Sequence, residues 1–183
     1  MKRTFLSLFT LLLVTHSLIA DETPFPGYHI TCSQEILELQ VHLTELIHEQ
    51  SGARILHILA PDPENVFCLS FCTLPESSKG VAHMLEHTVL EGSQKFPSKH
   101  LFELMKRRCS STFMNAFTSS DSTYYVAASQ VEADFYHLLE VYLDVVFHPL
   151  LEPKSFAQEG HRLEFARPDD PTSPLEYKGV VYN

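Results

Sequence analysis

The 183-residue chain has no tryptophan, few basic residues and no long uninterrupted apolar run. Its 13 lysines and arginines face 23 acidic residues, which gives a formal net charge of −10. Because binding to phosphate backbones needs clusters of lysine and arginine, this composition argues against a nucleic-acid partner. It is compatible with cationic partners such as basic peptides, although an acidic surface can simply keep a protein in solution.

Cysteine is also scarce, and the four cysteines form no C-x-x-C pair. A zinc site built from thiolates is therefore not expected. Cys68 and Cys72 lie in a strand-like run, where four residues span about 13 Å, too far for a mutual disulfide. We expect most of the cysteines to be buried, free thiols.

The longest apolar stretch, residues 4–20, follows a short positive MKR segment and is interrupted by serine, threonine and histidine. Its continuous apolar part, Leu11–Val14, is far shorter than the roughly 20 residues of a membrane-spanning helix. The pattern is typical of a secretory signal peptide over residues 1–20. We therefore expect no stable membrane span and an exported protein, periplasmic or secreted, whose mature part is residues 21–183.

Alternating and β-branched segments predict strands over residues 38–47, 54–59 and 66–73, joined by turns into an antiparallel meander. Residues 112–118 and 123–128, separated by SSDS, predict a β-hairpin. The chain length fits a single domain.

Helical periodicity occurs in four segments: residues 80–90, 99–107, 132–147 and 153–165. Ser77 or Ser78 could cap the first helix, and Gly92 could end it in a left-handed conformation. The RPDDPTSP segment after the last helix predicts a loop. The fold class expected is α/β (α+β), an antiparallel meander packed with helices.

The first predicted helix contains HMLEH, in which His83, Glu86 and His87 occupy positions i, i+3 and i+4 and share one helix face. Two imidazoles one turn apart can bind one zinc ion, Zn²⁺, at about 2.0–2.1 Å. A carboxylate on the same face, itself no ligand, can act as general base toward a water that the metal activates. This is the H-x-x-E-H order, the inverse of H-E-x-x-H. The alternative is an ordinary helix face with two solvated histidines.

Longer segments around the motif carry more information than its five residues. GVAHMLEHTVLEGSQKFPSK resembles the active-site helix of the pitrilysin/insulinase-type zinc metallopeptidases, the inverzincins. NAFT, DSTYYVAAS, DFYHLLEVYLDVVFHPLL, FAQEG and LEYKGVVYN are similar, in the same order, to the presequence protease branch of that family. The resemblance runs from about residue 30 to the end. It implies the metallopeptidase domain fold and an endopeptidase that degrades short, unstructured peptides.

The resemblance also implies roles for individual residues. His83 and His87 would be zinc ligands, and Glu86 the general base. Asn115 and Ala116 would pair with the substrate backbone by strand addition, unless they belong to an ordinary inner strand. Glu159 would orient a histidine ligand through a hydrogen bond, unless it is a solvated helix carboxylate.

A catalytic zinc ion of this type uses three protein ligands. The resemblance implies that the third is a glutamate directly after Asn183, so residues 21–183 would be the N-terminal part of a catalytic domain. We therefore expect an incomplete catalytic unit, inactive alone, whose site downstream domains or a partner chain would complete. The alternative function is a non-catalytic, exported module that binds peptide or metal.

Overall fold

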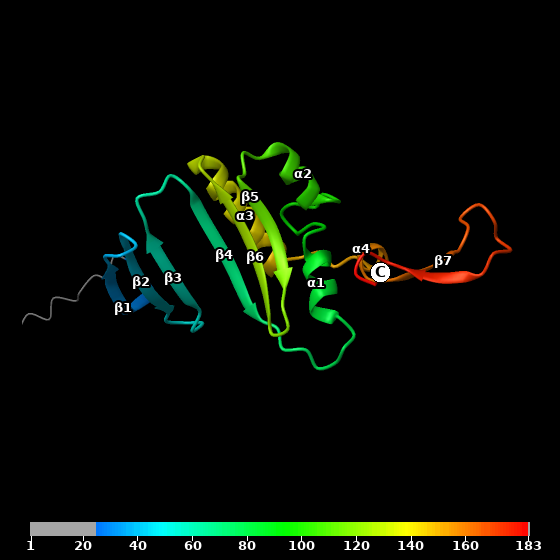
Figure 1. Cartoon of the computed structure of the whole chain (residues 1–183), viewed down its shortest axis with the longest axis horizontal. Coiled ribbons are helices and arrows are strands. Elements are labelled where there is room, and N and C mark those ends of the chain that lie inside the picture. Colours follow the sequence, from blue (N-terminus) through cyan, green and yellow to red (C-terminus); the bar gives the residue numbers. More distant parts are fainter. Residues whose placement is uncertain (1–24, 183) are drawn as a thin grey trace, which may run out of the picture. The chain divides into compact units, whose positions relative to one another are not determined.

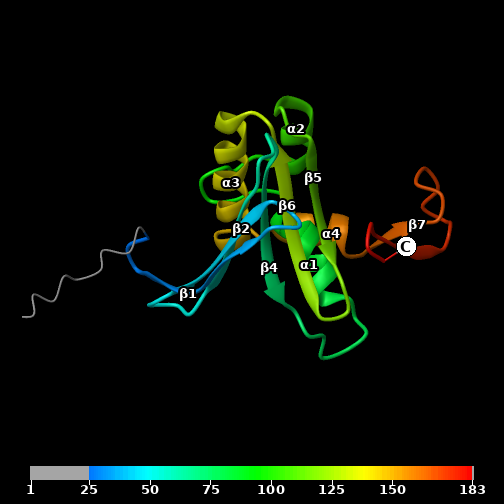
Figure 2. The same cartoon turned by 60° about the vertical axis from the view of Figure 1, so that its left-hand side comes forward.

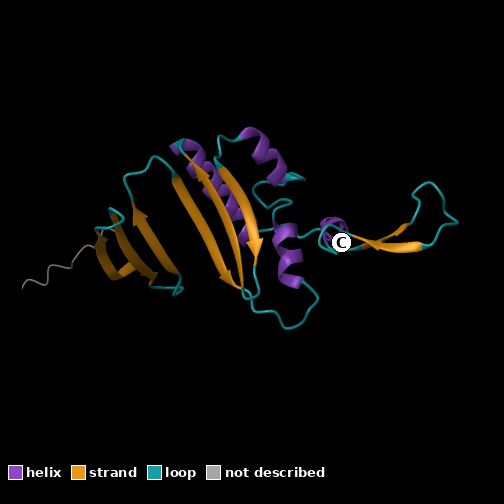
Figure 3. Ribbon diagram, viewed as in Figure 1, coloured by secondary structure: helices purple, strands orange, loops and turns teal. Residues whose placement is uncertain are grey.

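A computed structural model of the chain describes residues 25–182, which form two compact units divided after Pro61. The predicted signal peptide, residues 1–20, lies outside the described residues and stays a prediction. Within residues 25–182 every helix belongs to the second unit (Figures 1 and 3), and none of these helices is long and apolar enough to cross a bilayer. The predicted class, antiparallel sheets with helices, is confirmed.

The first unit is a three-stranded antiparallel meander, formed by β1 (Tyr28–Ile36), β2 (Val41–His48) and β3 (Arg54–Leu59) in the order β1-β2-β3. The meander was predicted, but β1 was not, because its side chains are exposed or half-buried and show no apolar alternation. The first predicted strand, residues 38–47, corresponds to β2 and starts later than expected, since Gln40 has a φ of +55° in the turn that precedes it.

The second unit contains a sheet of β4 (Asn65–Cys72), β5 (Phe113–Thr118) and β6 (Ser122–Ser129), all antiparallel in the order β4-β6-β5. The predicted β5–β6 hairpin is confirmed. The third strand predicted for the meander instead pairs with β6, so that Phe67 lies opposite Ala127. In this arrangement Phe67, Leu69 and Phe71 of β4 are half-buried against the core, which local sequence patterns do not predict.

Three helices contribute buried side chains to the core together with this sheet: α1 (Val81–Val89), α2 (Leu101–Arg108) and α3 (Glu132–Phe147). Figure 2 shows α3 running along one side of the sheet. The predicted apolar stripe of α3 forms the centre of the core, where Tyr142 is fully buried and meets Phe67 edge to face at 5.1 Å between ring centroids. Burying a side chain of this size stabilises the fold by about 1.5–3 kcal/mol.

The ends of α1 differ from the prediction. Its N-cap is Gly80, with a φ of +66° and no side-chain cap, so neither Ser77 nor Ser78 caps the helix. The helix ends at Val89, and Gly92 lies beyond the cap with a φ of +145°. A Cβ at Gly92 would lie 2.9 Å from the Ser98 carbonyl oxygen, so close backbone approach requires this glycine.

The last predicted helix is wrong in its second half. α4 covers only Pro153–Glu159, and the chain then forms a hairpin of β7 (Arg162–Phe165) and β8 (Leu175–Lys178). The helix was predicted too long because the positions of Leu163 and Phe165 fit a strand as well as a helix. In a strand both side chains point to one face. Their cross-strand partners, Tyr177 and Leu175, complete an apolar face on the hairpin.

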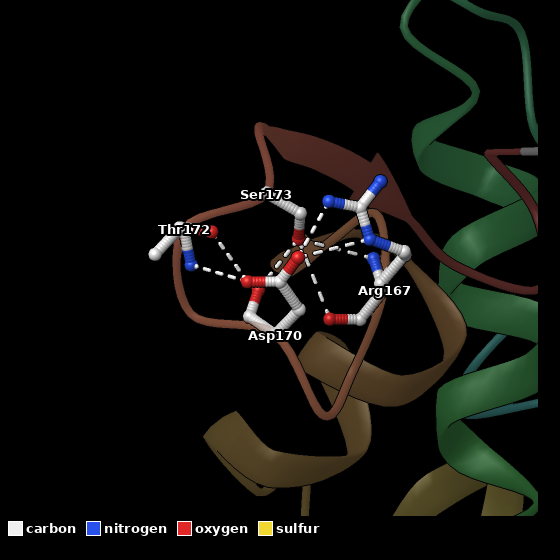
Figure 4. Close-up of polar contacts among 4 residues, drawn as sticks. All are labelled: Arg167, Asp170, Thr172 and Ser173. Carbon is white, nitrogen blue, oxygen red and sulfur yellow. Dashed lines mark hydrogen bonds and ion pairs between the residues drawn. The ribbon is translucent and has the colours of Figure 1, made fainter.

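The predicted RPDDPTSP loop connects β7 to β8 and is held by its own polar groups (Figure 4). Asp170 accepts hydrogen bonds from the backbone N–H of Thr172 and from Nε of Arg167, at 2.9 and 3.0 Å. The Ser173 hydroxyl donates to the Asp170 carbonyl at 2.7 Å. The hydrogen bond from the Thr172 hydroxyl, followed by that from Arg167, lowers the pKa of Asp170.

The four cysteines are free, as expected, but the expectation of burial is wrong, since Cys32 and Cys109 are only half-buried. Cys68 and Cys72 are exposed. They lie on the face of β4 opposite to Phe67 and Phe71, the residues that pack toward α3, because successive strand residues point to opposite faces. The sequence pattern established the strand but not which of its faces is covered.

Candidate functional site

α1 presents His83, Glu86 and His87 to a single cavity of about 590 Å³, as their helical spacing predicts. We call it the polar cavity. It is lined by Leu90, Glu91, His100, Phe102, Glu103, Asn115, Ala116, Phe117, Thr118, Gln158, Glu159 and Val180, in addition to the motif. Segments far apart in the sequence therefore meet at the predicted motif.

The two histidines lie close enough to share a ligand. Their ring centroids are 4.9 Å apart with the planes tilted by 68°. Nδ1 of His87 lies 3.0 Å from Oε2 of Glu159, and since a carboxylate only accepts, the nitrogen must donate. In a neutral imidazole this contact places the proton on Nδ1, which leaves Nε2 as the nitrogen that could bind a metal.

Glu159 is nearly buried, with 7% of its surface exposed, and both of its oxygens are engaged. Oε2 accepts from His87, and Oε1 accepts from the side-chain amide of Gln158 at 2.8 Å. The structure therefore places the predicted residue beside a motif histidine rather than in solvent. Its proposed function as an orienting group stays a prediction.

A crossing of two glycines holds α4 against the C-terminal segment. A Cβ on Gly179 would lie 1.9 Å from the carbonyl oxygen of Gly160, so no larger residue fits there without movement. Immediately beyond the crossing, the backbone N–H of Val181 donates to the Glu159 carbonyl at 2.8 Å. The two glycines thus fix the position of Glu159, a function that the sequence analysis missed.

Glu86 is also nearly buried, at 6% exposed. The Thr118 hydroxyl donates to its Oε2 at 2.5 Å, a contact across 32 residues. Tyr125 lies nearby in the core, and its burial, followed by the negative charge of Glu86, raises the pKa of the phenol. Thr118 was not predicted; its position three residues after Asn115 in NAFT was the available signal.

The two predicted substrate-binding residues lie in β5, which is an edge strand of its sheet. Asn115 and Ala116 both line the polar cavity, so the structure brings them to the motif. The backbone N–H of Ala116 donates to Oδ1 of Asn115 at 2.9 Å rather than to a neighbouring strand. A peptide that adds to this edge would therefore displace the Asn115 side chain from this amide.

The lining of the polar cavity is strongly acidic. It contains four glutamates and no lysine or arginine. Glu91 and His100, two residues that were not predicted, form an ion pair with 3.2 Å between Oε2 and Nδ1 when the imidazole is protonated. Glu103 on α2 is exposed and has no ion pair among the described residues. Negative charge thus predominates around the motif.

The donors in the cavity match part of a zinc site. Two neutral imidazoles at i and i+4 are ligands that zinc prefers, and Glu159 supplies the acceptor that such a histidine usually has. Within residues 25–182, however, no group of three histidine, cysteine, aspartate or glutamate side chains is placed to hold a metal. The chain therefore offers two of the three expected ligands, and the predicted third beyond Asn183 stays a prediction.

The opposite side of α1 borders a second cavity, of about 900 Å³, which we call the apolar cavity. Its lining includes Val81, Met84 and Leu85 from α1, and Phe156 and Tyr177 from α4 and β8. It contains no carboxylate. One helix therefore separates a polar from an apolar environment.

Comparison with known proteins supports the sequence resemblance. A family model described as Insulinase (Peptidase family M16) matches residues 74–169, more than half of the chain. The chain is 48% identical over 157 residues to "Presequence protease, mitochondrial" of Xenopus tropicalis, which covers 86% of this chain and 15% of the relative. The protein of the same name from Danio rerio is 51% identical over 146 residues, covering 80% and 14%.

Relatives outside the vertebrates show the same pattern. "Presequence protease, mitochondrial" of Kluyveromyces lactis is 45% identical over 159 residues, covering 87% of this chain and 16% of the relative. The crystal structure of pitrilysin superposes with a TM-score of 0.59 at 21% identity, over 72% of this chain and 14% of pitrilysin, which supports the fold alone. The chain thus spans about 15% of the length of these curated relatives.

The relatives contradict the predicted location. Export to a periplasm or secretion was expected, yet these vertebrate and fungal relatives are named as mitochondrial proteins. The prediction was wrong because it depended only on a positive segment followed by an interrupted apolar stretch.

Proposed function

Because the chain belongs to the insulinase family of peptidases, peptidase family M16, we propose that its polar cavity is part of the active site of a zinc-dependent endopeptidase that cleaves short, unstructured peptides. One observation carries the proposal. His83, Glu86 and His87 converge on one cavity, and the buried carboxylate of Glu159 holds the second nitrogen of His87. A solvated helix face would need no such partner.

In this proposal His83 and His87 would hold the metal through ring nitrogens. A bound zinc ion supplies Lewis-acid polarisation of the scissile carbonyl and activates water. Glu86 takes the proton from the attacking water, and later passes it to the leaving amine, as general base and then general acid. Its burial keeps the carboxylate in one place, while Glu159 keeps the His87 ring in one orientation.

The peptide would add to the edge of β5, where Asn115 and Ala116 line the cavity. Displacement of the Asn115 side chain would free the Ala116 amide for the substrate backbone. An extended, unstructured peptide can pair in this way along its whole length, whereas most of the backbone of a folded protein is already engaged in its own hydrogen bonds. This supports short peptides as the substrate class.

The charge of the cavity supports basic peptides among these substrates. Glu91 and Glu103 lie in its lining, and no lysine or arginine offsets them. A cationic side chain near the scissile bond would gain favourable electrostatic energy there, an effect that salt screens. The net charge of −10 adds long-range attraction.

The proposal needs one more ligand than residues 25–182 offer. We propose that it comes from outside the described residues, from downstream domains or from a partner chain that would also help to enclose the substrate. Glu159 is a poor substitute, because ligation would cost it the hydrogen bonds to His87 and Gln158.

The test uses the protein as its gene produces it, in wild-type form and as Glu86→Gln. We expect one bound zinc in both, cleavage of an unstructured basic peptide by the wild type, and a loss of kcat of about 10²–10⁴-fold in the variant. Equal cleavage by both proteins would contradict the proposal. Peptide binding without turnover by the wild type would instead indicate a non-catalytic binding module.

A further inference from the structure

We propose that Thr118 is a positioning residue that holds the carboxylate of Glu86 in its working orientation, at the end of a chain of three threonine hydroxyls. The inference rests on the proposed function, since it assigns Thr118 a part in proton transfer by Glu86. The hydroxyl chain runs from Thr73 through Thr123 to Thr118 and leads to the carboxylate.

The contact between Thr118 and Glu86 is the sole hydrogen bond of this carboxylate among the described residues. Oε2 lies 2.5 Å from the Thr118 hydroxyl oxygen, a distance typical of a strong, charge-assisted hydrogen bond. A glutamate side chain otherwise rotates easily about its last torsion, which has a broad energy minimum. With Oε2 held, Oε1 is the oxygen left to receive a proton.

The direction of the hydrogen bonds follows from the proton count. A hydroxyl has one proton, and an ionised carboxylate can only accept, so Thr118 gives its proton to Glu86. Thr118 must then accept from Thr123 across 3.4 Å, and Thr123 from Thr73 across 2.8 Å. The 3.4 Å contact is long for a hydrogen bond between hydroxyls, so the bond from Thr118 to the carboxylate is the strong link of the chain.

The scaffold makes this chain stiff. Thr118 and Thr123 are cross-strand partners at the closed end of the β5–β6 hairpin, and Thr123 is only 3% exposed. Branching at Cβ restricts the first torsion of each threonine. The sheet therefore holds Thr118 rigidly, and the hydrogen bond from Thr118 restricts the movement of the Glu86 side chain on α1.

The test compares Thr118→Val, which keeps the shape and removes the hydroxyl, with Thr118→Ser, which keeps the hydroxyl. We expect kcat to fall by about 10- to 100-fold in Thr118→Val, with KM and zinc content within about two-fold, as is usual for residues behind the reacting groups. Thr118→Ser should recover most of the kcat. Thr112→Val is the matched control, because its hydroxyl bonds Glu64, outside the polar cavity.

A second measurement needs no metal and no turnover. In the metal-free protein, the proton of the short hydrogen bond should give a downfield, exchange-protected NMR resonance that shows cross-peaks to the Thr118 methyl group. It should vanish in Glu86→Gln and in Thr118→Val and persist in Thr112→Val. This comparison of wild type with Glu86→Gln remains decisive if Thr118→Val fails to fold.

The outcomes separate the two proposals. If Thr118→Val keeps the kcat of the wild type while Glu86→Gln is inactive, the positioning role is wrong and the peptidase proposal stands. If the wild type does not cleave peptides, or Glu86→Gln cleaves them equally well, the peptidase proposal fails and the positioning role fails with it. A protected hydroxyl proton without an effect on kcat would reduce Thr118 to a structural residue.

Discussion

The two sides of α1 differ in the kind of contact that their side chains make with the rest of the chain. On the polar side, His83, Glu86 and His87 line a cavity that contains four glutamates, Glu86 among them. Glu86 and His87 each form a side-chain hydrogen bond there, with Thr118 and Glu159. On the apolar side, Met84 and Leu85 face a larger cavity without any carboxylate. The first side depends on directed hydrogen bonds and the second on non-directional apolar contact.

This difference teaches how sequence changes should act. Substitutions on the apolar side should change the free energy of unfolding in proportion to the area they remove from contact. Substitutions on the polar side should change metal binding or catalysis with little effect on stability. The segment around Gly179 borders both sides, through Val180 and Val181, and so should affect both.

The largest effect is expected for Gly179→Ala, which should reduce stability and zinc binding together and so affect both sides of α1. The added Cβ collides with the Gly160 backbone, so the crossing must open and Glu159 must move. We expect a loss of about 3 kcal/mol or more in the free energy of unfolding, measured by chemical denaturation, together with weaker zinc binding.

Gly80→Ala is the control for this change. Gly80 has a φ of +66°, whereas Gly179 is not among the glycines with a positive φ, and no atom lies within 4 Å of a Cβ added at Gly80. It should cost only about 1–2 kcal/mol of backbone strain. A Gly179→Ala protein no less stable than Gly80→Ala would show that the crossing is not rigid.

His83→Ala should affect zinc binding and Met84→Ala should affect stability, so the pair tests the difference between the two sides most clearly. His83 is exposed, so its loss should change stability by less than about 0.5 kcal/mol while weakening zinc binding by more than about 100-fold. Met84 is half-buried, so its truncation should cost about 1–2 kcal/mol and leave zinc binding intact. Zinc titration and denaturation of both variants check the pair, and equal losses in either measurement would contradict the division.

Glu103→Gln tests whether the negative charge of the polar cavity favours basic peptides. We expect KM for a basic peptide to rise about two- to five-fold, because an exposed ion pair contributes about 0.2–1 kcal/mol. The effect should disappear at high salt and with a neutral peptide. Glu132→Gln, an exposed residue of α3 outside the cavity, is the control. The same rise in KM for a neutral peptide would rule out charge recognition.

The smallest effect is expected at a site that borders neither cavity. The lowered pKa of Asp170 means that its contribution to stability is present above its unfolded pKa of about 3.9 and is lost as the pH falls through the lower folded value. Asp170→Asn should slightly lower the unfolding midpoint at pH 7 and flatten the decline below about pH 4. Zinc binding at pH 7 should not change. Any change would contradict the expectation that this loop is energetically independent of the histidines on α1.

The sequence predicted the local features well. The spacing of His83, Glu86 and His87, the stripe of α3 and the β5–β6 hairpin are periodic signals over neighbouring residues, and the structure has all three. The resemblance to a family added Glu159, Asn115 and Ala116, which the structure places in the same cavity.

What the sequence did not predict is set by contacts between distant residues. Thr118 and the Gly160–Gly179 crossing have no periodicity, and their functions appear only when separate elements meet. The strand Arg162–Phe165 was read as helix because its pattern is ambiguous until its partner is known. Capping by Ser77 or Ser78 failed because a glycine already supplies the turn into α1.

The separations along the chain also set an order of assembly during synthesis. The motif is translated first, the Thr118 partner of Glu86 follows 32 residues later, and the Glu159 partner of His87 follows after 72 residues. At about 5–20 residues per second, the last interval corresponds to about 4–14 s. A nascent chain therefore carries both motif histidines for several seconds before the carboxylate that hydrogen-bonds His87 has been synthesised, so the polar cavity is completed only after most of this chain has left the ribosome.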